Sequence, residues 1–142
     1  MRKAILLGLV VVLLVAGAVA VGCGGGGTDK AAVTAVQASL GKINTAIQDL
    51  TAKGTAMTLT VADIKSARDS LKPEVQSIID NGKKIKGADT GAVQKAWTDL
   101  DTAVTGLPDT ATLLDIAPVL MTKLTPLTDA LDKITAVAAA AK

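Results

Sequence analysis

Apolar residues recur along the chain after Lys30 at alternating intervals of three and four positions. The first series of this kind consists of Val33, Val36, Leu40, Ile43, Ile47 and Leu50. These intervals place all its members on one face of an α-helix, whereas a half-buried strand would alternate apolar and polar residues. The pattern therefore predicts an amphipathic helix that is capped by Thr28 or Asp29 and ends at Gly54.

A second segment begins at Thr60-Val61-Ala62-Asp63, which fits a capping box with Asp in the place of the usual Glu or Gln. Its apolar positions continue from Val61 to Ile85 with helical spacing. Pro73 removes a backbone donor and crowds the carbonyl four residues earlier. We therefore expect a kink at Pro73 or the start of a new helix there. Asn81-Gly82 weakens the end of this segment.

Two more amphipathic segments follow. The third runs from about Thr90 to Thr105 and ends at the turn signal Gly106-Leu107-Pro108-Asp109. The fourth runs from about Thr110 to the terminal alanines, and Pro118 and Pro126 within it predict two bends or a break.

Four helical segments with short connections, and no period-two alternation, predict an all-α fold. We expect an antiparallel bundle of about four helices over residues 30–142. Two matches along the chain suggest two repeated αα-hairpins: Ala35-Val36-Gln37 with Ala92-Val93-Gln94, and Leu71-Lys72-Pro73 with Leu124-Thr125-Pro126. Alanine-rich amphipathic helices also produce such matches by chance, so both interpretations stay open.

The first 30 residues follow a different pattern. Arg2 and Lys3 precede an uncharged apolar run over residues 4–22, and the chain's only cysteine, Cys23, follows it directly. Four glycines come next. This arrangement resembles the lipobox signal peptide of bacterial lipoprotein precursors, although Ala20 stands where Leu is most frequent. The resemblance implies a diacylglyceryl group on the Cys23 thiol and cleavage between Gly22 and Cys23.

Two other interpretations of this segment remain. Its 19 apolar residues would span roughly 28 Å as a helix, which is enough for an uncleaved transmembrane anchor. Ala18-Val19-Ala20 also fits ordinary secretory cleavage. The lone Cys23 favours the lipoprotein. We expect a signal peptide (1–22), a lipidated cysteine with a glycine-rich leash (23–29), and a bundle domain (30–142) facing outward from the cell membrane or outer membrane.

The charge balance changes once the signal peptide is removed. The whole chain has 15 basic and 13 acidic residues, and two of the basic ones are Arg2 and Lys3. The mature chain then carries 13 of each and is neutral, so we expect no nucleic-acid partner.

Residues suited to catalysis are scarce. The chain has no His and no Tyr, and Cys23 is its only thiol. Asp99 and Asp101 would lie about 200° apart around a helix, too far to chelate one ion. We therefore expect no enzymatic activity, no catalytic or metal site, and no cofactor.

Three features remain as functional candidates. Lys83, Lys84 and Lys86 form a basic cluster that suits either a helix C-terminus or an anionic lipid or polymer. Trp97 fits core packing or a ligand platform. Lys142, the final residue, resembles the C-terminal lysine of the murein lipoprotein, which is joined to peptidoglycan.

These features favour a membrane-anchored lipoprotein of the bacterial cell envelope. Its helical domain would bind or scaffold an envelope protein or a cell-wall component. One alternative is a structural tether or spacer joined to the cell wall through Lys142. Another is a carrier or sensor that opens around an apolar ligand, which the prolines and the small Ala/Val side chains of the core suggest.

Overall fold

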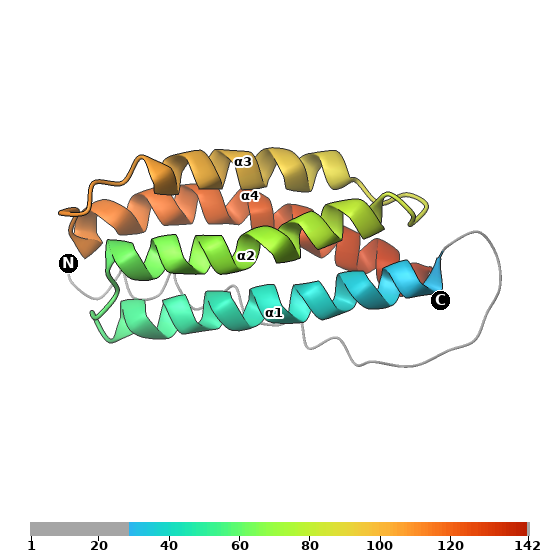
Figure 1. Cartoon of the computed structure of the whole chain (residues 1–142), viewed down its shortest axis with the longest axis horizontal. Coiled ribbons are helices and arrows are strands. Elements are labelled where there is room, and N and C mark those ends of the chain that lie inside the picture. Colours follow the sequence, from blue (N-terminus) through green and yellow to red (C-terminus); the bar gives the residue numbers. More distant parts are fainter. Residues whose placement is uncertain (1–28, 142) are drawn as a thin grey trace.

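The computed structural model describes residues 29–141, which form four helices and no strand. These are α1 (Lys30–Thr55), α2 (Val61–Gly82), α3 (Thr90–Thr105) and α4 (Leu113–Ala140). Consecutive helices run antiparallel around a shared core (Figure 1). The predicted all-α bundle of four helices is therefore confirmed. The predicted signal peptide, Cys23, the four glycines after it and Lys142 lie outside the described residues.

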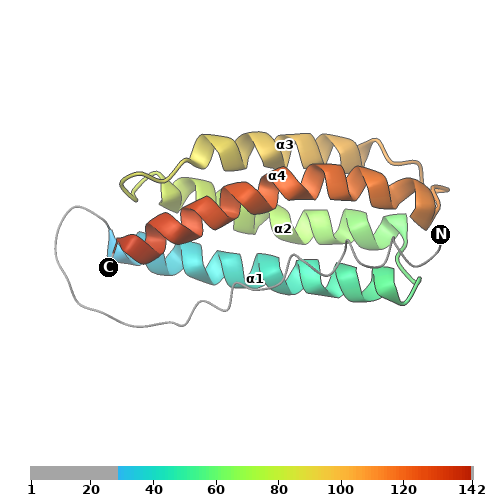
Figure 2. The same ribbon diagram turned by 180° about the vertical axis from the view of Figure 1, so that it is seen from behind.

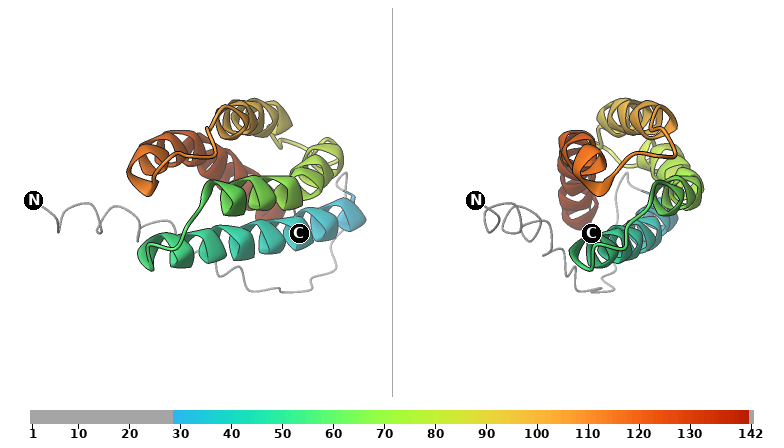
Figure 3. Two further views of the ribbon diagram at one scale, coloured as in Figure 1. Left: turned by 60° about the vertical axis from the view of Figure 1, so that its left-hand side comes forward. Right: turned by 90° about the vertical axis from the view of Figure 1, so that its left-hand side faces the viewer.

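The bundle consists of two helical hairpins, α1–α2 and α3–α4, which meet mainly where α2 packs on α3. α4 runs obliquely: it begins beside α3 and ends close to the start of α1 (Figures 2 and 3). Contact between α1 and α4 is therefore less extensive than the contact between any two consecutive helices. The two hairpins match the predicted halves in extent, whereas their origin by duplication stays a prediction.

The predicted apolar faces supply the core. Val36, Ile43 and Ile78 are at most 1% exposed, and so is Ile134 from α4. The C-terminal half of the predicted α1 face is less covered, because α4 lies away from α1 in this region (Figure 2). The residues left partly buried there are Ile47 and Leu50, and Leu40 in the middle of α1 is partly buried as well.

Side-chain caps start the helices close to the predicted positions. Asp29 Oδ1 accepts hydrogen bonds from the backbone N–H groups of Ala31 (2.9 Å) and Ala32 (3.4 Å), so Asp29 rather than Thr28 caps α1. The capping box of α2 at Thr60 and Asp63 is confirmed. α1 continues one residue past the predicted end at Gly54. Met57, with φ at 57°, adopts the left-handed conformation that the sequence suggested for the glycine.

The three prolines inside helices leave those helices continuous. α2 stays one helix through Pro73, although its ribbon changes direction about halfway along (Figure 1). α4 also runs unbroken through Pro118 and Pro126, so of the two expected outcomes, two bends or a break, the break does not occur. All three prolines lie on the exposed side of their helices. Carbonyls that lose a partner there can be hydrated, while the buried apolar face holds the helix together.

The bundle has two distinct ends. The start of α1, the α2–α3 connection (83–89) and the end of α4 lie together at what we call the terminal end (Figure 1). The α1–α2 connection (56–60) and the α3–α4 connection (106–112) lie together at the opposite end, the hairpin end.

Candidate functional site

A groove of about 420 Å³ follows the seam between α1 and α2. Small and polar side chains predominate in its lining, which consists of Lys42, Thr45, Ala46, Asp49, Leu50, Lys53, Asp63, Ser66, Ala67 and Ser70. These residues recur every three or four positions on each helix, because they form the neighbouring edges of two antiparallel helices. The groove can receive a polar group or an extended segment, and it is open to solvent along its length.

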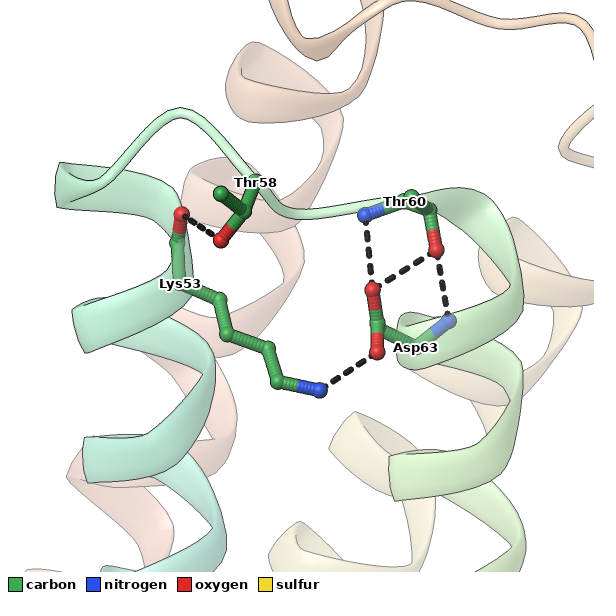
Figure 4. A network of polar contacts seen from close by, with 4 residues as sticks. All are labelled: Lys53, Thr58, Thr60 and Asp63. Carbon is green, nitrogen blue, oxygen red and sulfur yellow. Dashed lines mark hydrogen bonds and ion pairs between the residues drawn. The ribbon is translucent and has the colours of Figure 1, made fainter.

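A polar network closes the groove at the hairpin end (Figure 4). Lys53 Nζ donates to Asp63 Oδ1 at 2.5 Å. The other carboxylate oxygen of Asp63 accepts from the Thr60 hydroxyl (2.7 Å) and the Thr60 backbone N–H (3.0 Å). The pKa of Asp63 is lowered to about 2, mainly by the hydrogen bond from Lys53 and to a smaller extent by those from Thr60. This carboxylate is therefore an ionised structural acceptor, which is a poor starting point for proton transfer near neutral pH.

The middle of the same seam holds a second ion pair. Lys42 Nζ donates to Glu74 Oε1 at 2.8 Å, and this bond is the main cause of the lowered pKa of Glu74. Lys65 donates to Asp109 at 2.6 Å and thereby joins α2 to the α3–α4 connection. The acidic side chains along these seams thus link neighbouring elements, which suits a binding or structural surface better than an acid–base pair.

A smaller groove of about 290 Å³ lies between α3 and α4. Lys95 Nζ donates to Asp99 Oδ2 at 2.8 Å on one side of it, and Asp129 and Lys133 line the other side. Each hairpin therefore has a shallow groove along its seam. The α1–α2 groove lies towards the hairpin end of the bundle, whereas the α3–α4 groove lies towards the terminal end.

The candidate acidic pair of α3 is divided between two partners. Asp99 bonds to Lys95, whereas Asp101 lies 3.6 Å from Arg68 of α2. No group of three or more His, Cys, Asp or Glu residues in the described part of the chain is arranged to hold a metal ion. Trp97 is 9% exposed and belongs to the core cluster, which agrees with the packing interpretation.

The three lysines of the basic cluster lie in the α2–α3 connection at the terminal end. Lys83 is the C-cap residue of α2, and Lys84 and Lys86 follow it. All three are exposed, whereas Ile85 between them is 3% exposed and packs into the core. The buried isoleucine holds the connection against the bundle and directs its lysine neighbours outward.

The hairpin end carries exposed apolar side chains that sequence reasoning missed. Met57, in the α1–α2 connection, and Leu114, in the first turn of α4, are each 78% exposed. The sequence carries a signal for Leu114, because the apolar residues of the fourth segment that recur at intervals of three and four begin with Leu113, Ala117 and Leu120 and leave Leu114 out. The left-handed conformation of Met57 had no such signal, since Gly54 was the expected site.

Comparison with known proteins found no match to a family model, a curated protein or a solved structure. Across residues 29–141, no helix combines the length and apolarity that crossing a membrane requires. The class that the described residues define is an antiparallel four-helix bundle with shallow, charged grooves along its seams.

Proposed function

We propose that this protein is a lipid-anchored protein of the bacterial cell envelope whose helical bundle holds a protein partner at the membrane surface. The observation that carries the proposal is the position of Cys23, the only cysteine, between an uncharged apolar run and four glycines. Two acyl chains on that residue would hold the protein stably, whereas one chain binds a bilayer only reversibly.

The direction of the bundle supports this proposal. α1 begins at the terminal end, so an anchor on Cys23 reaches the bundle there. The hairpin end then faces away from the membrane and presents Met57 and Leu114 to a partner. An exposed apolar side chain can serve as an anchor in a protein–protein contact, in which a few residues contribute most of the affinity.

The same geometry favours a partner-binding role over that of a spacer between the membrane and the cell wall. α4 ends at the terminal end, where α1 begins (Figure 1). A cell-wall linkage through Lys142 would therefore be at the same end of the bundle as the lipid anchor. The length of the bundle would not separate the two attachments, as a spacer requires.

The anchor is tested by the intact mass and acyl labelling of the mature protein. The wild-type chain should begin at Cys23 and carry the lipid, and Cys23→Ala should lose both the label and the processing. Gly26→Ala is the matched control and should retain both. A wild-type mature protein that begins at Val21, or that keeps residues 1–22, would refute the proposal.

Partner binding is tested by capture from detergent-solubilised envelope with the tagged, lipidated protein. Substituting Leu114 or Met57 with Ser should reduce the captured partner at least tenfold, because removing an interface anchor costs about 2 kcal/mol. Met121→Ser is the matched control, since Met121 is a half-exposed apolar residue two turns further along α4. If the Leu114 and Met57 variants captured as much partner as the Met121 variant, the hairpin end would not be the binding surface.

A further inference from the structure

The basic α2–α3 connection has a fixed shape. Its backbone bonds follow one another closely: Lys84 N–H donates to Asn81 O (3.0 Å), Ile85 N–H to Gly82 O (2.9 Å) and Ala88 N–H to Ile85 O (3.2 Å). Ile85 is buried in the core. The exposed lysines on both sides of Ile85 are therefore presented by an ordered turn instead of a loose loop.

Lys30 adds to this charge from a neighbouring element. It is the first residue of α1, it is exposed, and α1 begins at the same end of the bundle (Figure 1). Lys30, Lys83, Lys84 and Lys86 thus lie at the same end of the bundle, and we call this set of lysines the basic end surface.

Three aspartates lie in the same region, and each is engaged. Asp29 and Asp89 cap the N-termini of α1 and α3, where the helix dipoles offset much of their charge. Asp80 accepts from Gln76 at 3.0 Å and lies 4.0 Å from Lys83. Lys30, Lys84 and Lys86 form no ion pair with the described residues, so the excess positive charge lies on them.

The sequence keeps this surface near the proposed anchor. Lys30 lies seven positions after Cys23 in the sequence, so the chain between them can extend over at most about 25 Å. A glycine-rich chain of this length has a typical end-to-end distance of about 15 Å. α1, with 26 residues, is about 39 Å long, so the hairpin end can lie well beyond the reach of the membrane's electric field.

We infer that the basic end surface is a second membrane contact, which docks the terminal end of the bundle on anionic phospholipid headgroups. This inference rests on the proposed lipid anchor. The anchor keeps the protein on the membrane, and the lysines select one orientation of the bundle. Each lysine close to an anionic surface favours that location by a factor of about five, so Lys84 and Lys86 together favour it by about 25-fold.

The test uses the full chain, matured to the lipidated form and reconstituted into vesicles. One set contains phosphatidylcholine alone, and the other contains phosphatidylcholine with phosphatidylglycerol. Amine acetylation of each lysine is followed by mass spectrometry. Lys30, Lys84 and Lys86 should react several-fold more slowly on the anionic vesicles, while Lys53 and Lys65 at the hairpin end should react equally on both. High salt should remove the protection.

A paired variant isolates the charge. Lys84→Gln with Lys86→Gln should abolish the protection of Lys30 on anionic vesicles and leave the anchor in place. Lys72→Gln with Lys95→Gln is the matched control, since both lysines are exposed on the sides of the bundle, and it should retain the protection.

The outcomes separate this inference from the proposed function. A lipidated protein whose Lys30 and Lys84 react equally on both kinds of vesicle overturns the second contact and leaves the anchor intact. In that case the lysines serve only the C-terminus of α2, and the Gln variant should lower thermal stability instead. A mature protein without lipid at Cys23 overturns both.

Discussion

Asp63 is the residue on which the most interactions of the α1–α2 seam converge. It completes the capping box of α2 and also pairs with Lys53 of α1. A single carboxylate thus fixes both the start of one helix and its distance from the other. Because the interactions with Lys53 and Thr60 require the ionised form, their contribution to stability depends on pH.

Asp63→Asn should lower the free energy of unfolding at neutral pH, and this loss should shrink in acid. The pKa of Asp63 falls from 3.8 to about 2 on folding, so its carboxylate stabilises the fold fully above about pH 4 and loses this effect as the pH falls towards 2. Urea unfolding of both proteins at several pH values checks this prediction. Asp132→Asn is the control, because the Asp132 side chain is exposed and makes no hydrogen bond or ion pair with the described residues.

Met57→Gly should stabilise the bundle by about 0.5 kcal/mol. A side chain in the left-handed region costs about 1 kcal/mol, and the greater freedom of glycine in the unfolded chain offsets part of the gain. The same variant should lose partner capture if Met57 is a binding anchor. Ala56→Gly is the matched control, since Ala56 has φ at −75°, and it should destabilise the protein. A Met57→Gly protein less stable than wild type would contradict this prediction.

At the scale of the helices, the sequence predicted most boundaries because capping residues act locally. The helix from Thr90 to Thr105 was predicted with the observed bounds, and Thr60 caps α2 as the capping box required. The outcome at Pro118 and Pro126 depends on packing instead. Pro126 lies on the outer side of α4, while Leu127 next to it is 1% exposed. Nothing in the local sequence shows that burial of the apolar face outweighs the hydrogen bond lost at the proline.

The candidate sites were less predictable than the helices. Trp97 belongs to an apolar series with Val93, Leu100 and Val104, so its burial followed from helical spacing. The Lys53–Asp63 pair joins two helices, and its formation depends on how α1 and α2 align, which the spacing within one helix does not fix. The gathering of Lys30 with Lys84 at one end likewise required the topology of the bundle.

Two glycines should respond in opposite ways to substitution by alanine. Gly41 lies inside α1, and a Cβ atom there would meet nothing within 4 Å, so Gly41→Ala should stabilise the protein by about 1 kcal/mol. A Cβ atom on Gly82 would lie 2.6 Å from Thr90 Cγ2, so Gly82→Ala should destabilise it by about 1 to 3 kcal/mol. Thermal unfolding of both variants checks the two signs, and a stabilising Gly82→Ala would show that the α2–α3 junction is looser than described.

For the molecule as a whole, stability depends on apolar residues that join the two hairpins. Ile134 of α4 is fully buried and lies near Gly82 of α2. Ile134→Ala should lower the free energy of unfolding by about 3 kcal/mol, because the cavity left behind adds to the lost burial. Leu114→Ala, at an exposed site on the same helix, should change it by less than about 0.5 kcal/mol. Denaturant titration measures both, and equal effects would contradict the described core.

The limited contact between α1 and α4 has a consequence for how the chain acquires its structure. Most helix pairs in the bundle are neighbours in the sequence, and proteins rich in such local contacts fold rapidly. When the chain emerges N-terminus first, α1 can pack against α2 before α3 and α4 have emerged. The seam between the first and last helices then closes as the final step. Opening this seam breaks fewer contacts than opening the seam between any two consecutive helices.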